Sequence, residues 1–136
     1  MAKLTVEIVT PEKRILSAQV DEAVVPGAEG LFGVRPGHTP FLSLLEPGTL
    51  VLKDAGKSQA FFVAGGFAEV SADKVLVLAD QAEEAARIDL DGAKRRYEEA
   101  QANLKGLSSA DARFHVETAT VKREAARMAA AGRPQV

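Results

Sequence analysis

The N-terminal part of the chain alternates between apolar and polar residues over short stretches. Leu4, Val6 and Ile8 are separated by Thr5 and Glu7, which is the period of two expected for a strand with one buried face. Similar runs, bounded by turn-forming residues, follow at 15–25 (interrupted by Asp21 and Glu22), 33–34, 41–44, 49–53, 58–64, 67–71 and 75–78. This spacing predicts a β-sandwich of two antiparallel sheets with eight to ten short strands.

The same alternation predicts which side chains fill the space between the two sheets. We expect much of this core to come from Leu4, Val6, Ile8, Val24, Phe61, Val63, Val75 and Val77. Two reversals have clear turn residues: Asp54-Ala55-Gly56-Lys57 is typical of a hairpin turn, and Gly65-Gly66 of a plain reversal.

After Asp80 the composition changes to strong helix formers, with almost no β-branched residues before Val116. An apolar stripe at helical spacing predicts a first helix that ends near Gly106, and residues 81–87 are interpreted as the connector before it. The residues of this stripe are Ala93, Tyr97, Ala100 and Leu104.

A second helix is predicted to follow, with Ser108 as its N-cap, Asp111 three residues later and an end at about Ala131. Its apolar stripe consists of Ala112, Val116, Ala119 and Ala126. Because these side chains are small, two such helices bury little area. The sequence therefore predicts a sandwich domain over residues 1–86 and a movable helical hairpin over residues 87–136.

Composition limits the chemistry that the chain can perform. It has no cysteine and only two histidines, His38 and His115, so we expect no disulfide and no metal site. No apolar run reaches the roughly 20 residues that span a bilayer, and no leader peptide precedes the first strand, so we expect a cytoplasmic location. Residues 1–86 carry 7 basic and 12 acidic side chains, whereas residues 87–136 carry 10 and 7.

Residues 26–48 are rich in proline and glycine, and Pro26-Gly27, Pro36-Gly37 and Pro47-Gly48 each predict a type II turn. The pattern Gly27-x-x-Gly30-x-Phe32-Gly33-Val34-x-Pro36-Gly37-His38-x-Pro40, followed by apolar residues and Pro47-Gly48, resembles the epsilon subunit of bacterial-type ATP synthases. One departure is Leu31, where many members of that family carry an acidic residue.

The resemblance implies an N-terminal β-sandwich, a C-terminal helical hairpin and a non-catalytic role in the rotor, the central stalk. Its implied partners are the gamma subunit, the ring of c subunits and the catalytic alpha/beta head, with the complex held peripherally at the cytoplasmic face of the membrane. It makes Glu29, Leu31 and His38 candidates for docking. It also implies that the hairpin inhibits ATP hydrolysis, with Arg113, Arg123 and Arg127 meeting an acidic segment of the beta subunits.

Some family members bind ATP through the motif Ile/Leu-Asp-x-x-Arg-Ala at the start of the hairpin. Ile88, Asp89 and Ala93 match this motif and are candidate nucleotide-binding residues, but Gly92 replaces the arginine. The planar donor that would grip a phosphate is therefore missing. We favour Asp89 as an ordinary helix N-cap and expect no cofactor.

The sequence contains no recognisable enzyme motif. It has no phosphate-binding Gly-x-x-x-x-Gly-Lys-Ser/Thr loop and no histidine at motif spacing from a serine. It also lacks the dense basic run and interleaved aromatics of a nucleic-acid-binding protein. An alternative to a stalk subunit is a free-standing β-sandwich that binds a ligand and dimerises through its helical tail.

Overall fold

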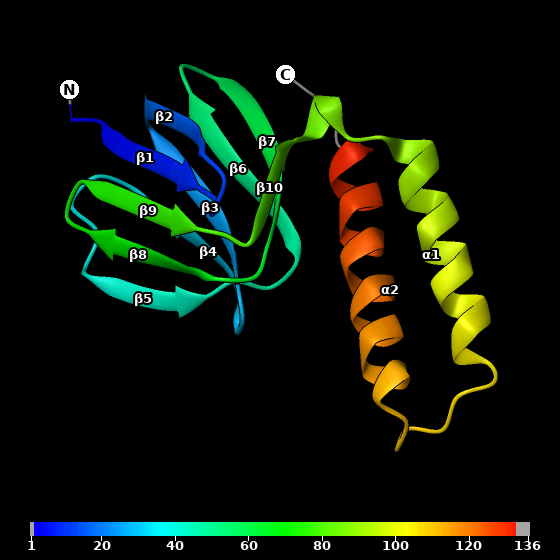
Figure 1. Ribbon diagram of the computed structural model, residues 1–136. Coiled ribbons are helices and arrows are strands. Elements are labelled where there is room, and N and C mark those ends of the chain that lie inside the picture. The colour runs from blue at the N-terminus through cyan, green and yellow to red at the C-terminus, as the bar shows by residue number, and fades with distance from the viewer. Residues whose placement is uncertain (1, 133–136) are drawn as a thin grey trace.

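The computed structural model describes residues 2–132 and confirms a β-sandwich followed by a helical hairpin (Figure 1). Sheet 1 has the strand order β2 (Arg14–Val20), β1 (Leu4–Val9), β9 (Lys74–Leu78), β8 (Phe67–Ser71), β5 (Phe41–Leu44). Sheet 2 has the order β10 (Gln81–Glu84), β7 (Lys57–Ala64), β6 (Gly48–Asp54), β3 (Glu22–Gly27), β4 (Gly30–Val34). One pair departs from the expected antiparallel arrangement, because β1 and β9 run parallel.

The core between the sheets contains every predicted side chain except Val24. Within β3, Ala23 and Val25 are the buried residues that face sheet 1, and Val24 is only half-buried. The prediction for Val24 is wrong by one residue, and in a strand one residue changes the face. Val24 instead lines a groove on the outer face of sheet 2.

Only one of the three proline-glycine turns forms as predicted. Gly37 has φ +84°, the left-handed conformation that such a turn requires, but Gly27 ends β3 and Gly48 begins β6. Glycine is needed at the latter two positions because chains approach closely. A Cβ atom at Gly48 would lie 2.8 Å from the Cβ of Pro26, and one at Gly27 would lie 2.8 Å from Ser43 Oγ.

The predicted connector at 81–87 is in fact structured. Residues Gln81–Glu84 form β10, which pairs antiparallel with β7, and a single 3-10 turn, η1 (Ala85–Arg87), follows. The sandwich therefore continues up to the hairpin without a flexible linker. Its sequence did not predict a strand, because glutamate is uncommon in strands and β10 contains two in succession.

The hairpin consists of α1 (Leu90–Leu104) and α2 (Ala112–Ala131). Asp89 caps α1, and its side chain accepts a 3.0 Å hydrogen bond from the backbone N–H of Gly92. Asp111, not Ser108, caps α2 by accepting a 2.9 Å bond from the N–H of Arg113. Helix α1 ends at Leu104, ahead of Gly106.

The stripe predicted for α1 is confirmed, since Ala93 and Ala100 are buried. The stripe predicted for α2 is largely wrong, because its first three residues, Ala112, Val116 and Ala119, are exposed. The buried positions of α2 are Glu124, Arg127 and Ala130. Two of these three are charged, so a search for apolar periodicity could not find the inward face.

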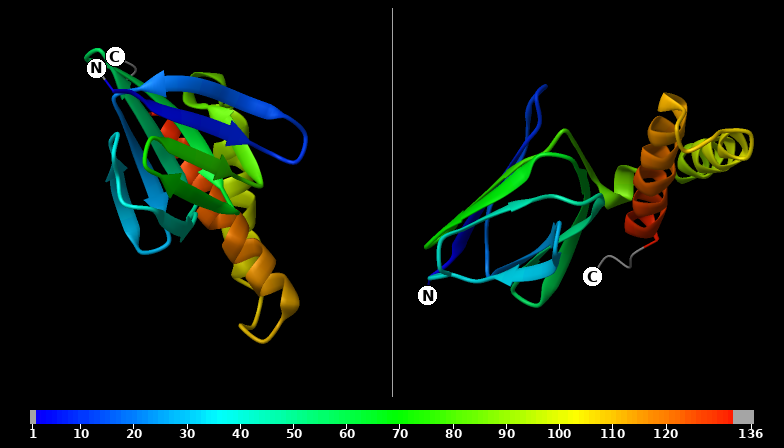
Figure 2. Two further views of the ribbon diagram at one scale, coloured as in Figure 1. Left: turned by 90° about the vertical axis from the view of Figure 1, so that its left-hand side faces the viewer. Right: turned by 90° about the horizontal axis from the view of Figure 1, so that it is seen from below.

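The hairpin lies against the outer face of sheet 2, with α2 next to the sheet and α1 behind it (Figures 1 and 2). Phe62, in β7, is fully buried there beneath Ala126 and Ala130 of α2 and against Ile88. Its neighbours Phe61 and Val63 point the other way, into the core. Strand β7 is thus apolar on both faces, as in a strand covered on both sides.

We expect a buried and an exposed leucine to differ sharply in their effect on stability. Leu50 is fully buried between the sheets, so Leu50→Ala should lower the free energy of unfolding by about 2–5 kcal/mol. Leu42 is 63% exposed, and the matched control Leu42→Ala should change it by less than about 0.5 kcal/mol. Urea titration followed by circular dichroism measures both, and equal losses would contradict the assigned core.

Candidate functional site

Five large apolar side chains are exposed on the two edge strands β4 and β5 and at the start of β8, which pairs with β5. We call this the edge patch, and its residues are Leu31, Phe41, Leu42, Leu44 and Phe67. Leu31 and Leu44 are about 70% exposed, at 71% and 68%. Contiguous exposed apolar surface of this kind is typical of a protein–protein interface.

Two of the strands that carry the edge patch are edge strands, although the backbone N–H of Ala28 donates a 2.9 Å hydrogen bond to the carbonyl of Leu44 at the end of β5. β4 is the last strand of sheet 2, and β5 is the last strand of sheet 1. Phe32 and Phe41 bridge the two strands, with ring centroids 5.1 Å apart in an edge-to-face arrangement. An apolar edge left open in this way is a place where another chain can pack or pair.

The predicted docking residues fall at two ends of this region. Glu29 and Leu31 line a hollow of about 450 Å³ together with Phe41 and Leu42 of the edge patch. His38 lies beyond the far end of β4, where the N–H of Gly37 donates a 3.1 Å hydrogen bond to Asp73 Oδ1. The structure therefore brings Glu29 and Leu31 together but not His38.

Sequence reasoning missed the four other members of the edge patch. A signal was present, because Phe41, Leu42 and Leu44 are apolar on both faces of a short strand, and only one face can meet the core. All three are exposed because β5 is an edge strand. Edge position depends on strand order, which hydrophobic periodicity does not contain.

A second candidate site is the ionic cluster inside the hairpin. Glu124 of α2 is buried, yet three arginines converge on its carboxylate. Arg96 of α1 approaches it at 3.3 Å, Arg123 at 3.1 Å and Arg127 at 2.6 Å. A buried carboxylate is tolerated only when such partners satisfy it.

The cluster shifts the pKa values of its members. Burial raises the pKa of Glu124, but the hydrogen bonds from Arg127, Arg123 and Arg96 outweigh it and leave the pKa below its ordinary value. Burial lowers the pKa of Arg127, but the hydrogen bonds to Glu83 and Glu124 outweigh it and leave the pKa above its ordinary value. The ionised Glu124 therefore stabilises the fold above the ordinary glutamate pKa, and this contribution is lost as the pH falls through the lowered value.

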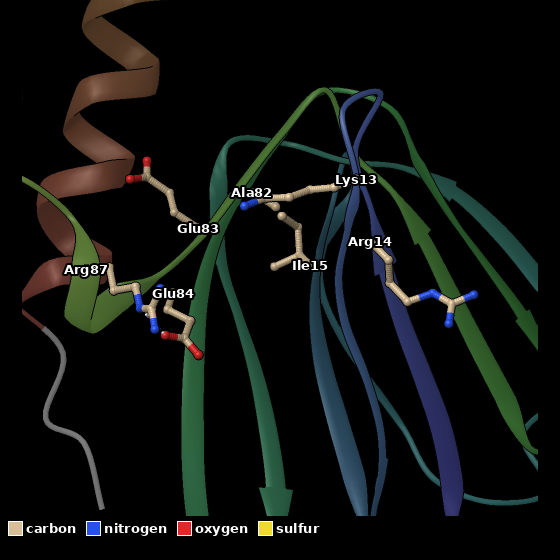
Figure 3. A pocket seen from close by; sticks show the side chains of 7 residues that line it. All are labelled: Lys13, Arg14, Ile15, Ala82, Glu83, Glu84 and Arg87. Atoms are coloured by element: carbon tan, nitrogen blue, oxygen red, sulfur yellow. Dashed lines mark ion pairs between the residues drawn. The ribbon is translucent and has the colours of Figure 1, made fainter.

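Arg127 also joins the hairpin to the sandwich. Its Nε lies 2.8 Å from Glu83 Oε2 and its Nη2 lies 3.2 Å from Glu83 Oε1, so the pair is bidentate. Figure 3 shows that Glu83 points from β10 towards α2, whereas Glu84 points the other way, towards Arg87. The other two arginines expected to meet the beta subunits pair within the hairpin: Arg123 with Glu124, and Arg113 with the N-cap Asp111 at 2.8 Å.

The three candidate nucleotide residues have structural roles in this conformation. Asp89 caps α1, Ile88 packs near Phe62, and Ala93 is fully buried. Gly92 is buried, and a Cβ atom there would collide with the carboxylate of Asp89. That Cβ position is also 3.3 Å from Nη2 of Arg96, whose guanidinium is already paired with Glu124.

Within residues 2–132, no three His, Cys, Asp or Glu side chains form a cluster suited to a metal ion. Neither helix in this range combines the length and the apolar character needed to cross a bilayer.

Within residues 2–132, the fold is a sandwich of two five-stranded sheets with a helical hairpin over one of them. Comparison with known families and solved structures finds the same architecture in subunits of ATP synthases. Residues 3–85 match the family described as "ATP synthase, Delta/Epsilon chain, beta-sandwich domain". The fold resembles a chain of the Euglena gracilis mitochondrial ATP synthase structure with a TM-score of 0.84, at 24% identity over 96% of this chain and 82% of that one. A chain from the central stalk and c-ring structure of the Tetrahymena thermophila mitochondrial enzyme matches with a TM-score of 0.68, at 16% identity over 95% and 96% of the two chains.

Two sequence relatives are both the same subunit of ATP synthase, the epsilon chain. The ATP synthase epsilon chain of Myxococcus xanthus (strain DK1622) is 70% identical over 131 residues, which cover 96% of each chain. That of Anaeromyxobacter sp. (strain K) is 49% identical over 130 residues, covering 96% of this chain and 98% of the relative. The chain therefore belongs to the ATP synthase epsilon chain family.

Proposed function

We propose that this chain is a non-catalytic subunit of the central stalk of a proton-translocating ATP synthase, at the cytoplasmic face of the membrane. Its sandwich joins the gamma subunit to the ring of c subunits. Its hairpin regulates ATP hydrolysis by the catalytic alpha/beta head. Membership of the epsilon chain family supports the proposal that the chain is a subunit of ATP synthase. The edge patch is the observation that supports docking of the sandwich onto partner subunits.

The edge patch suits a permanent partner better than a small ligand. Its side chains are large, apolar and exposed on two edge strands and the start of β8, and the adjacent hollow is lined by Glu29 as well as by leucine and phenylalanine. Covering such side chains contributes about 25 cal/mol per Å² of apolar area. We infer that Glu29 and Leu31 lie at this interface, and that His38 contacts the partner at the other end of β4.

The net charge of the hairpin and its ion pairs support the proposed role in regulating ATP hydrolysis. Residues 87–136 carry three more basic than acidic side chains. In the docked hairpin, Arg113, Arg123 and Arg127 are each paired with a carboxylate of this chain. An acidic segment of the catalytic beta subunits offers the same chemistry, so the three arginines are suited to exchange one carboxylate partner for another.

The alternative of a ligand-binding module that dimerises through its tail has less support. The relatives match this chain over nearly its whole length and are named as subunits of one complex. The hairpin also packs α2 onto its own sandwich, where a dimer would need it to pack onto a second copy.

Crosslinking tests the docking surface. The chain has no cysteine, so Glu29→Cys, Leu31→Cys, His38→Cys and Leu44→Cys each introduce a single reactive site. We expect these sites in the assembled complex to crosslink to the gamma subunit or the c subunits, whereas the exposed control Glu12→Cys, in the β1–β2 turn, gives much less product. Crosslinks that reach only the catalytic head would refute the docking proposal.

Removal of the hairpin tests regulation. A chain that ends at residue 86 should still assemble, and the complex should hydrolyse ATP faster than the intact one. Because truncation uncovers Phe62, the truncated chain should also carry Phe62→Thr to keep that sheet face polar. An unchanged hydrolysis rate across a range of nucleotide concentrations would show that the hairpin is not inhibitory here.

Within the full chain, replacing Arg113, Arg123 and Arg127 with glutamine should reproduce part of this increase. The effect should be larger at low salt, where screening is weak. Replacing the exposed Lys13, Arg14 and Lys57 of the sandwich with glutamine is the control with the same change in charge.

We also propose that ATP binds weakly or not at all, because the arginine position of the motif is Gly92 and Arg96 beside it is held by Glu124. Gly92→Arg should strengthen binding, measured by titration calorimetry, once the Asp89 carboxylate moves aside. Gly92→Ala displaces the same carboxylate without adding a donor, so it serves as the control. Tight binding of ATP by the unaltered chain would contradict this account.

A further inference from the structure

The docked hairpin is joined to the sandwich by one bidentate ion pair. Arg127 contacts Glu83 through two nitrogens, and its side chain is only 10% exposed. The other ion pair between α2 and the sandwich joins Lys122 to Glu46, and the lysine side chain is 60% exposed. Exposed pairs contribute little, whereas this pair is bidentate and its guanidinium is buried, although the Glu83 side chain is 32% exposed.

Residues of the hairpin also hold the side chain of Arg127 in place. Its Nη1 donates a 2.6 Å hydrogen bond to Glu124, one turn earlier in α2. Arg96 and Arg123 hold the same carboxylate, so the position of Arg127 is set before it meets Glu83. The pair with Glu83 therefore costs little side-chain entropy beyond what the hairpin has already lost.

We propose that Glu83 is an internal competitor for Arg127 and that it sets how often the hairpin leaves the sandwich. While Arg127 is paired with Glu83, it cannot bind an acidic partner. When the hairpin leaves, the guanidinium loses Glu83 and becomes available to a carboxylate-rich protein segment. The two contacts exclude each other, so weakening the first favours the second. The part that concerns the partner rests on the inhibitory role proposed above.

Strand β10 supplies a matched control for this proposal. Glu83 and Glu84 are adjacent, but alternation along the strand directs them to opposite sides (Figure 3). Glu84 pairs with Arg87 at 3.0 Å and accepts a 3.3 Å hydrogen bond from Gln59, so it makes no ion pair with α2. Glu83→Gln and Glu84→Gln remove the same charge from the same strand, and only the first removes the ion pair with Arg127.

The first experiment uses the isolated chain. Cysteines at the exposed positions 12 and 119 carry a fluorophore pair, and energy transfer reports the fraction of molecules with an undocked hairpin. We expect Glu83→Gln to raise the ratio of undocked to docked molecules about tenfold, which corresponds to about 1.4 kcal/mol. Glu84→Gln should leave the ratio unchanged, and equal effects of the two variants would overturn the proposal.

The second experiment measures ATP hydrolysis by the reconstituted complex. Glu83→Gln should strengthen inhibition, because it frees the hairpin with Arg127 intact. Arg127→Gln should also undock the hairpin but should inhibit less than Glu83→Gln, because the competing guanidinium is gone. Circular dichroism shows whether the helices of Arg127→Gln persist, and Arg127→Lys replaces it if they do not.

The outcomes separate the two proposals. If Glu83→Gln undocks the hairpin but neither it nor removal of residues 87–136 changes hydrolysis, the ion pair holds the hairpin and the inhibitory role is wrong. If removal of the hairpin raises hydrolysis but Glu83→Gln and Arg127→Gln act alike, the inhibitory role stands and the competition is wrong.

Discussion

The burial of Phe62 is the interaction on which the arrangement of the two domains depends. Strand β7 places Phe61 in the core and Phe62 on the outer face of sheet 2, where the hairpin covers it completely. Burying a side chain of this size contributes about 1.5–3 kcal/mol. The apolar contact made by α2 consists otherwise of small residues, Ala126 and Ala130, and the ion pair of Arg127 with Glu83 adds a directional contact between the helix and the sheet.

The sandwich does not need the hairpin to complete its hydrophobic core. The core between the sheets is complete without α1 or α2, because none of its members comes from the helices. The edge patch lies on β4, β5 and the start of β8, and the hairpin covers β6 and β7. A partner could therefore hold the sandwich by the edge patch while the hairpin docks or leaves.

Much of this could be predicted from the sequence, because alternation over 4–9 or 75–78 reports directly on a buried face. The predictions that failed concern residues whose burial or pairing depends on contacts far apart in the sequence. Strand β10 contains consecutive glutamates and is recognisable only through its pairing with β7, and the inward face of α2 includes Glu124, which is tolerated because three arginines meet it. The edge patch was missed because strand order decides which apolar residues stay exposed. The uninterrupted apolar run 60–64 was the signal that could have shown a sheet covered on both faces.

Copurification tests the central claim, that this chain is a stalk subunit held by its sandwich, most directly. The chain is tagged at its N-terminus and isolated from gently solubilised membranes of its own cells. The account predicts that gamma, the c subunits and the alpha/beta head elute with it in fixed proportion, and that the charged edge-patch variant Leu42→Glu with Leu44→Glu loses them while remaining folded. Elution of the unaltered chain as a homo-oligomer free of these subunits would contradict the account.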